Sequence, residues 1–409
     1  MVVLASTAGA LIGTFTGLIP GVHVNTAAAI MLGTYPLMVE FVSGFTDPAY
    51  TPILVSCCIM SASAVHSFVD FIPSVFIGVP DADNVASVLP GHRLLLQGDG
   101  MLAVRAAAIG SVIGSLSALA LAIPLQWIMM QGASGYIDYL TEGVIVITLI
   151  VIMLNTDRPA VTLAMILVSG LLGYAVNHLD IPTYSVLGEG TLLFPLLTGL
   201  FGIPPLLEKV KPGRRIPQRD CESDPVGPVP GLKGVVTGLI AGWFPGVTAT
   251  AGALVAASFT EERDPARFIS MTASIGTVTS VFSIVTLSVS GSGRSGTCIV
   301  VKDIIGDSLS GFCSEAFTLI LFSMAVASLL GYCSTVAGGK VMSEVFSLVP
   351  ENLVNNLVLV LIVVLVVLFT GPFGLAILMV SATVGMIPPA AGISRVCLTG
   401  CLLIPVLFG

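Results

Sequence analysis

Charged residues are scarce in this sequence, and long apolar runs take their place. Only 9% of the 409 residues are Asp, Glu, Lys or Arg, whereas 55% are hydrophobic. Soluble globular domains carry about 25% charged residues, and each membrane-spanning helix needs about 20 apolar ones. The composition therefore excludes an ordinary soluble domain. It predicts an all-α, polytopic helical membrane protein with about 10–12 segments, some of them broken.

Lys and Arg are missing from the first 92 positions, and no basic patch for nucleic acid occurs anywhere in the sequence. Because the start, Met-Val-Val-Leu-Ala, lacks a basic n-region, we do not expect a cleavable signal peptide. By the positive-inside rule, loops in this region are not expected in the cytoplasm. The eight cysteines show no Cys-x-x-Cys or Cys/His spacing, so we expect structural thiols, no metal site and no cofactor.

One pattern occurs twice: three glycines spaced four apart, followed by Pro-Gly-Val. The copies run from Gly9 to Val22 and from Gly234 to Val247, at a constant offset of 225 residues (246 − 21). Glycines at this spacing form a stripe without side chains on one helix face, so another helix can approach its backbone closely. Pro-Gly then breaks the helix. Two such breaks in matching positions are the sequence sign of a transporter built from repeats.

Each break is followed by small polar residues, and an exposed helix end suits an anion. We therefore predict a substrate site at both breaks, although glycine stripes that only pack helices are the alternative. The first segment is short, so a re-entrant hairpin and a discontinuous helix from Met1 both remain open. The predicted binding residues are Pro20, Gly21, His23, Asn25 and Thr26 in the first copy, and Pro245, Gly246, Thr248 and Thr250 in the second.

A second irregular stretch lies between Pro73 and Gly100, where prolines and Pro-Gly pairs exclude one regular helix. Asp81, Asp83 and Asn84 offer oxygen ligands for a coupling cation, Na⁺ or H⁺; an ordinary exposed loop is the alternative. In the second half a Gly-Ser stretch around Arg294 takes the same place, and we expect Arg294 to pair with a carboxylate or phosphate.

The only hydrophilic linker separates the two halves. Residues 208–233 hold six of the fifteen Lys and Arg residues, which predicts a flexible cytoplasmic connection. We therefore divide the chain into an N-terminal transmembrane repeat, 1–207, this linker, and a C-terminal transmembrane repeat, 234–409. Basic residues flank residues 234–259 but not the first copy, so the repeats are expected to be inverted.

The glycine and proline motifs together resemble the large membrane subunit, TctA, of tripartite tricarboxylate transporters, in its compact, mostly archaeal branch. The resemblance covers essentially the whole chain and rests on Gly13-x-x-x-Gly17-Leu-Ile-Pro20-Gly21, Ile77-Gly78-Val79-Pro80, Pro90-Gly91-His92-Arg93 and Gly98-Asp99-Gly100. It implies ion-coupled uptake of citrate-like carboxylates with a small membrane subunit and an extracytoplasmic binding protein. The chain departs from the family pattern: it is shorter, His23 and Asn25 replace a usual Gly-Pro, and a Tyr-Gly-Gly segment is missing.

Three classes of function compete. The first is a secondary transporter of a small organic anion in the cell membrane, whose partners include the bilayer, the two further subunits and a second copy of the chain. The second is a polyprenyl-phosphate carrier translocase, which resembles this chain in using two Pro-Gly re-entrant segments. The third is an intramembrane enzyme, for which only the pair His66 and Asp70 speaks; a helix–helix hydrogen bond explains that pair better.

Overall fold

The computed structural model is helical throughout its described part. It describes residues 1–409 except 20–23, 79–84, 155, 179–191, 208–215, 222–225, 244–251, 254–261, 263, 292–294, 349 and 409. Within that part, six helices are long and apolar enough to cross a membrane. Shorter apolar helices accompany them, among them the two that carry the glycine stripes. The prediction of an all-α, polytopic membrane protein is confirmed.

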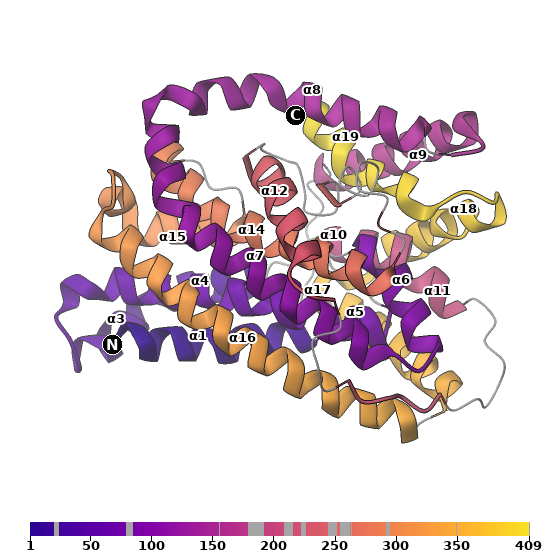
Figure 1. The fold of residues 1–409 in the computed structure, drawn as a ribbon, viewed down its shortest axis with the longest axis horizontal. Coiled ribbons are helices and arrows are strands. Elements are labelled where there is room, and N and C mark those ends of the chain that lie inside the picture. Colours follow the sequence, from indigo (N-terminus) through magenta and orange to yellow (C-terminus); the bar gives the residue numbers. More distant parts are fainter. Residues whose placement is uncertain are drawn as a thin grey trace.

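The first half of the chain begins with a helix, α1, that starts at Val2, seven residues before the first glycine of the stripe, Gly9. Its elements are α1 (Val2–Leu18), α2 (Val24–Gly33), α3 (Tyr35–Ser43), the 3-10 turn η1 (Pro48–Tyr50), α4 (Thr51–Val69), α5 (Phe71–Phe76), α6 (Val85–Leu96), α7 (Gly100–Ile128), η2 (Met129–Ala133), α8 (Ser134–Leu154), α9 (Pro159–His178), α10 (Leu193–Leu197), η3 (Thr198–Gly202) and α11 (Ile203–Leu207). Figure 1 shows their arrangement.

The second half follows the linker with fewer and longer elements. They are α12 (Val229–Trp243), α14 (Pro265–Ser290), α15 (Gly296–Ile305), η4 (Gly306–Leu309), α16 (Glu315–Leu348), α17 (Glu351–Gly385), α18 (Ile387–Ala390), η5 (Arg395–Thr399) and α19 (Gly400–Phe408).

Two prolines lie inside helices without ending them, Pro90 in α6 and Pro124 in α7. Proline removes one backbone hydrogen bond, and here the helix continues on both sides of that gap. The interruption expected between Pro73 and Gly100 is present, because α5 ends at Phe76 and α6 begins at Val85. At Gly371-Pro372 the chain kinks instead of stopping: Gly371 adopts φ 67° and ψ −161° inside α17. Only glycine tolerates that conformation without strain.

The glycine stripes pack as the sequence predicts. Gly9, Gly13 and Gly17 of α1 lie directly on α4, where a Cβ at Gly13 would lie 2.9 Å from the Cβ of Val65. Gly234, Gly238 and Gly242 of α12 lie on α14 in the same way, and a Cβ at Gly238 would lie 2.7 Å from the Cβ of Val278. Close backbone contact of this kind takes the place of hydrophobic driving force between helices in a membrane.

Beyond the stripes, the halves match at an offset of 213 residues. Gly78 and Gly291 both end a long helix with positive φ, 71° and 65°. Gly98 and Gly311 follow with φ 85° and 98°, at the same offset (311 − 98). The α8–α9 loop ends at Pro159, and the kink of α17 lies at Pro372, again 213 residues later. The helices from α4 to α9 therefore have counterparts from α14 to α17.

Each half contributes one long helix to the other half. Gly110 of α7 lies against the backbone of Ser270 in α14. At the equivalent place, the Oγ of Ser323 in α16 donates a hydrogen bond to the carbonyl oxygen of Cys57 in α4, at 3.4 Å. Correspondingly, α1 packs on α16 and α12 packs on α7. The two halves are thus intertwined rather than set side by side.

The equivalent helices α7 and α16 run antiparallel. Val104 near the start of α7 lies against Gly339 late in α16. At the other end, the Oε1 of Gln126 accepts a hydrogen bond from the N–H of Cys313, just before α16, at 3.1 Å. A two-fold axis perpendicular to both helices relates them, so the described parts of the two halves have opposite directions. Figure 1 shows the two helices crossing the molecule together.

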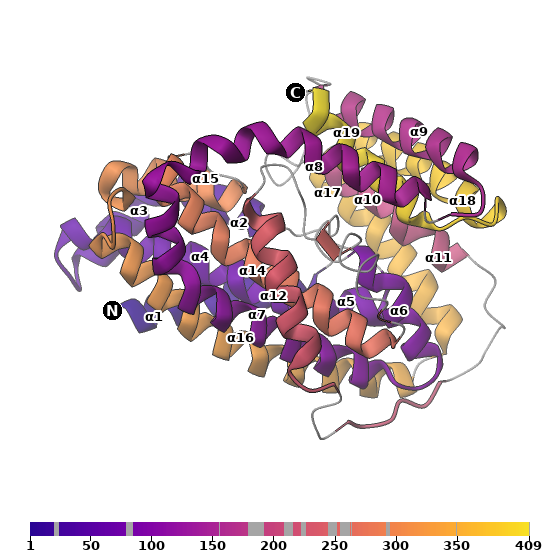
Figure 2. The same cartoon turned by 45° about the horizontal axis from the view of Figure 1, so that its top comes forward.

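A second hydrophobic core lies apart from these helices. It is formed by α8, α9, α10, η3, α17, η5 and α19, with Ile145, Leu196 and Leu398 among its buried side chains. Gly173 of α9 lies against the backbone of Cys401 in α19. In Figure 2, α9, α18 and α19 lie together at the upper right, away from α1, α3 and α16.

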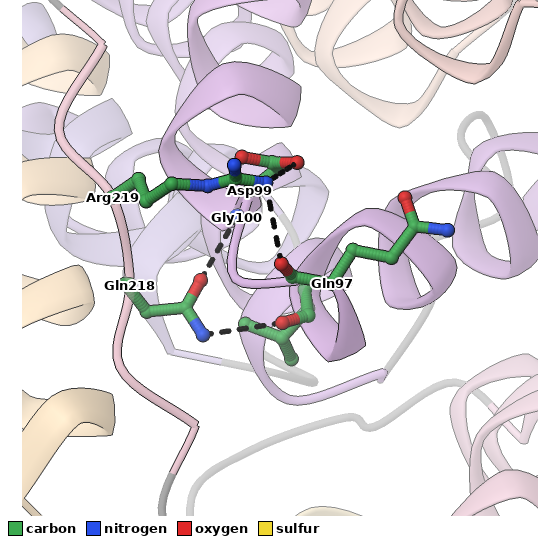
Figure 3. A network of polar contacts seen from close by, with 6 residues as sticks. Gln97, Asp99, Gly100, Gln218 and Arg219 are labelled. Carbon is green, nitrogen blue, oxygen red and sulfur yellow. Dashed lines mark hydrogen bonds and ion pairs between the residues drawn. The ribbon is translucent and has the colours of Figure 1, made fainter.

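Part of the linker is held in place by the first half. Residues 216–221, which we name the strap, run along the loop between α6 and α7 (Figure 3). The N–H of Arg219 donates to the carbonyl oxygen of Gly98 at 2.7 Å, and its guanidinium pairs with Asp99. The Oε1 of Gln218 accepts from the N–H of Gly100 at 2.9 Å. The expectation of a flexible connection is therefore wrong for the strap.

Candidate functional site

The first predicted break follows the glycine-striped helix α1 directly. α1 ends at Leu18, Ile19 has an extended backbone (φ −100°, ψ 107°), and the chain resumes as α2 at Val24. Pro20, Gly21 and His23 lie outside the described residues. Asn25 and Thr26 belong to the backbone of α2, and their side chains lie outside the described part. With 17 residues α1 is about 25 Å long, slightly less than the about 30 Å of a bilayer core.

The second break follows α12 at Trp243, and Pro245, Gly246, Thr248 and Thr250 all lie outside the described residues. The chain reappears at Gly252, where a Cβ would lie 2.9 Å from the Cβ of Ala241 in α12. The chain has therefore turned back toward the helix it left.

An ionic contact closes the base of this second segment. Glu262, whose side chain is 10% exposed, contacts Lys233 of α12 at 3.4 Å and Arg267 of α14 at 3.0 Å. Lys233 lies in the N-terminal part of α12, whereas the break lies at its C-terminal end. Glu262 therefore lies at the level at which α12 began.

The other two predicted segments begin at equivalent glycines. Gly78 follows α5 and Gly291 follows α14, where the Gly291 N–H donates to the carbonyl oxygen of Leu287 at 3.0 Å. Asp81, Asp83, Asn84 and Arg294 come next in the chain and lie outside the described residues. The sequence-based pairing of these two segments agrees with the 213-residue offset of their glycines. Downstream, the Oγ of Ser295 caps α15 by accepting from the Cys298 N–H at 3.2 Å.

The helices that flank these four segments interlock across the two halves. α2, which follows the first break, packs on α15, which follows the segment of Arg294. α6, which follows the segment of Asp81, packs on α14. Each predicted segment of one half is thus adjacent in the chain to a helix that contacts the other half. Figure 2 shows this inner group of helices with α12 and α14 at its front.

A buried polar contact lies one turn before the first break. The Nδ1 of His66 in α4 and the Oγ1 of Thr16 in α1 are 3.0 Å apart. His66 is 5% exposed, and Asp70, one turn later, is 7% exposed. The sequence had raised His66 and Asp70 as a pair, and the expected helix–helix hydrogen bond is present. The role of Thr16 was missed because no local pattern marks a threonine in a glycine stripe.

Comparisons with known proteins cover most of the chain. A family model described as "Tripartite tricarboxylate transporter TctA family" matches residues 3–400. An uncharacterized protein of Methanocaldococcus jannaschii is 29% identical over 300 residues, which cover 72% of this chain and 70% of that protein. No solved structure matches the chain.

Proposed function

Because this chain belongs to the tripartite tricarboxylate transporter TctA family, we propose that it is an ion-coupled permease for a small organic anion, a di- or tricarboxylate. The coupling ion is Na⁺ or H⁺, and the protein resides in the cell membrane. One observation carries the proposal: both halves place a glycine-striped helix on equivalent helices, α4 and α14, and end it at the same Pro-Gly. Paired helix breaks of this kind form substrate sites in transporters built from repeats.

The anion binds between the two breaks in this proposal. Backbone N–H groups at the N-terminal end of a helix and nearby hydroxyl or amide groups stabilise negative charge without a resident cofactor. Arg294 adds a bidentate partner for one carboxylate, and Asp81, Asp83 and Asn84 hold the coupling ion. The contributing groups at the breaks are Pro20, Gly21, His23, Asn25, Thr26, Pro245, Gly246, Thr248 and Thr250.

The family description also bears on partners. A tripartite system includes a small membrane subunit and an extracytoplasmic binding protein, and we propose that both serve this chain. The six basic residues of 208–233 orient that linker to the cytoplasm. The strap then marks the cytoplasmic end of α7, opposite to the side on which a binding protein delivers substrate.

Transport by the purified chain in liposomes tests the function. Radiolabelled citrate is offered with an inward Na⁺ gradient, an inward H⁺ gradient or neither, with and without the two partner subunits. We expect accumulation above the external concentration with one of the gradients, and its loss when an ionophore dissipates that gradient. Equal uptake in all conditions contradicts ion coupling. Saturable binding of a polyprenyl phosphate, with no binding of citrate or succinate, favours the carrier translocase instead.

A further inference from the structure

Two ionisable side chains are buried in the candidate membrane span with the largest buried share among the described residues. His66 and Asp70 belong to α4, which continues through α5 in an apolar stretch from Pro48 to Phe76 whose hydrophobic window is 83% buried. Burying ionisable groups in a membrane helix is costly, and such groups mark ion or proton pathways unless packing requires them. The internal repeat of this chain shows whether packing requires them.

The second half builds the same contact without any ionisable group. At the 213-residue offset, Thr279 stands for His66 and Ser283 for Asp70; at the 225-residue offset, Ala241 stands for Thr16. Gly17 lies against the carbonyl oxygen of His66 and the N–H of Asp70, and its counterpart Gly242 lies against Thr279 and Phe282. A glycine-striped helix therefore packs on its partner without histidine or aspartate, so packing does not explain the pair.

The position of the pair connects two predicted segments. Gly17, which touches both residues, lies three positions before the first break. His66, Asp70 and Ser74 follow one another at four-residue spacing, and all three are buried. Residues four apart share one face of a helix, so this face leads from the end of α1 toward Gly78 and the segment of Asp81.

On this basis, and assuming the proposed transport function, we propose that His66 and Asp70 bind a transported proton, in addition to the ion that Asp81, Asp83 and Asn84 hold. A proton from the outer solution adds to the imidazole of His66, and the resulting charge pairs with the carboxylate of Asp70. After the substrate has crossed, the same proton leaves to the inner solution, and one positive charge has moved inward. The positive charge offsets part of the substrate's negative charge, which lowers the cost of burying the anion.

Thr16 links this protonation to the first break. The hydroxyl of Thr16 donates to the carbonyl oxygen of Gly13 at 3.2 Å, so its oxygen accepts from the Nδ1–H of His66. An Nδ1–H is present in the imidazolium and in one neutral tautomer, so the 3.0 Å contact persists in both states. Because Thr16 lies in the last turn of α1, a change at His66 reaches the residues that precede Pro20 through a single hydrogen bond.

The surroundings of the pair are poor in other ionisable groups. Several elements pack on α4. The described residues of α1, α2 and α5 include no Asp, Glu, Lys, Arg or His, and the residues of these types in α3, α15 and α16 are exposed. The ionisable groups that are less exposed are Tyr35 of α3, Arg105 of α7, Arg267 at the start of α14, Tyr332 of α16, His92 of α6 beside α5, and the thiols Cys57, Cys58 and Cys298. His23, Asp81 and Asp83 lie in segments outside the described residues.

Calorimetry tests the proposal. It measures citrate binding by the full-length purified chain from pH 5.5 to 8. Binding linked to one proton changes affinity about tenfold per pH unit where the group titrates. We expect H66Q and D70N to lose this dependence and S283A, the matched change in the second half, to keep it. Citrate's own protonation is the same for every variant, so the difference in slope belongs to the protein.

Potentiometric titration of the protein without substrate gives a second readout. The parent and S283A should bind one proton more than H66Q between pH 5.5 and 8. If one variant does not fold, the other and the parent still give both measurements. Equal slopes and equal proton counts in H66Q, D70N and the parent overturn the proposal, and dependence on Na⁺ alone does the same. A parent that binds no carboxylate at any pH contradicts the proposed function, while the proton count still decides the role of the pair.

Discussion

Ser115 and Ser328 are counterparts in the two halves, and their hydroxyl oxygens lie 2.5 Å apart. They are separated by the same 213 residues that separate Gly78 from Gly291. A residue can touch its own counterpart only on the axis that relates the halves. The axis therefore passes through the crossing of α7 and α16, where both hydroxyl groups are buried.

Removing these hydroxyls one at a time should give unequal effects. The Oγ of Ser328 also donates to the carbonyl oxygen of Met324 at 2.7 Å, so Ser115 is the donor between the two hydroxyls. S115A leaves Ser328 bonded and should cost about 0.5–1 kcal/mol of the free energy of unfolding, whereas S328A leaves a buried donor and should cost about 1–3. Reversible unfolding in mixed detergent measures both. The double variant should cost no more than S328A, and additive losses would contradict a shared bond.

The glycine stripe offers a matched pair of substitutions. A Cβ at Gly13 would lie 2.9 Å from the Cβ of Val65 and 3.0 Å from the backbone nitrogen of His66. A Cβ at Gly276 in α14 would meet no atom within 4 Å. G13A should therefore destabilise the protein by about 1–3 kcal/mol. G276A should be neutral or stabilise it by up to about 1 kcal/mol, because alanine favours the helix. Thermal unfolding in detergent compares them, and equal melting temperatures would show that α1 has room to move away from α4.

Substitutions at the two breaks test the anion site. Each helix end near an anion contributes up to about 2 kcal/mol, and a charge-assisted hydrogen bond contributes about 1.5–3. N25A and T248A should each weaken citrate binding about ten- to a hundredfold, because 1.4 kcal/mol is tenfold. G21A and G246A should weaken it more. T7A, which removes an exposed hydroxyl of α1, is the control. If N25A and T248A both bind citrate with the affinity of the parent, the two breaks serve only the packing of the helices and not the binding of substrate.

Removing the side chains of Gln218 and Arg219, one at a time, should loosen the strap to different extents. The side chain of Arg219 is 69% exposed, so its pair with Asp99 is worth about 0.2–1 kcal/mol and weakens with salt. Gln218 accepts from Gly100 and donates to the carbonyl oxygen of Leu95 at 3.1 Å, so Q218A leaves two backbone groups without those partners. Amide exchange of residues 216–221 should rise more in Q218A than in R219A. Q97A is the control, since only the backbone of Gln97 contacts the strap (Figure 3).

Local patterns in the sequence predict the helices, the glycine stripes and their breaks, because spacing and turn chemistry determine these features. The change of offset from 225 to 213 was missed. The first half contains α3 and η1 between the break and α4, and the second half has twelve fewer residues there. The sequence carries a signal for the new offset in two pairs, Gly78 with Gly291 and Pro159 with Pro372.

The packing of α7 on the second half and of α16 on the first half, which we call the exchange of these helices, could not be predicted from the sequence. The contacts of Gly110 with Ser270 and of Ser323 with Cys57 join residues far apart in the chain, and no local pattern encodes them. The same holds for the glutamines at the starts of the two exchanged helices. Gln218 accepts from the Gly100 N–H and Gln126 from the Cys313 N–H, at equivalent positions, yet one comes from the linker and the other from α7.

The antiparallel pairing of α7 with α16 has a consequence for the origin of the chain. If one half arose by duplication of the other, the ancestral polypeptide inserted into the membrane in both orientations and paired with an oppositely oriented copy about a two-fold axis. The exchanged helices mean that neither copy could cover its α4-type helix alone, so the ancestor was an obligate dimer of oppositely oriented subunits. Fusion through residues 208–233, with six basic residues, then gave one fixed orientation to a protein that had previously needed both.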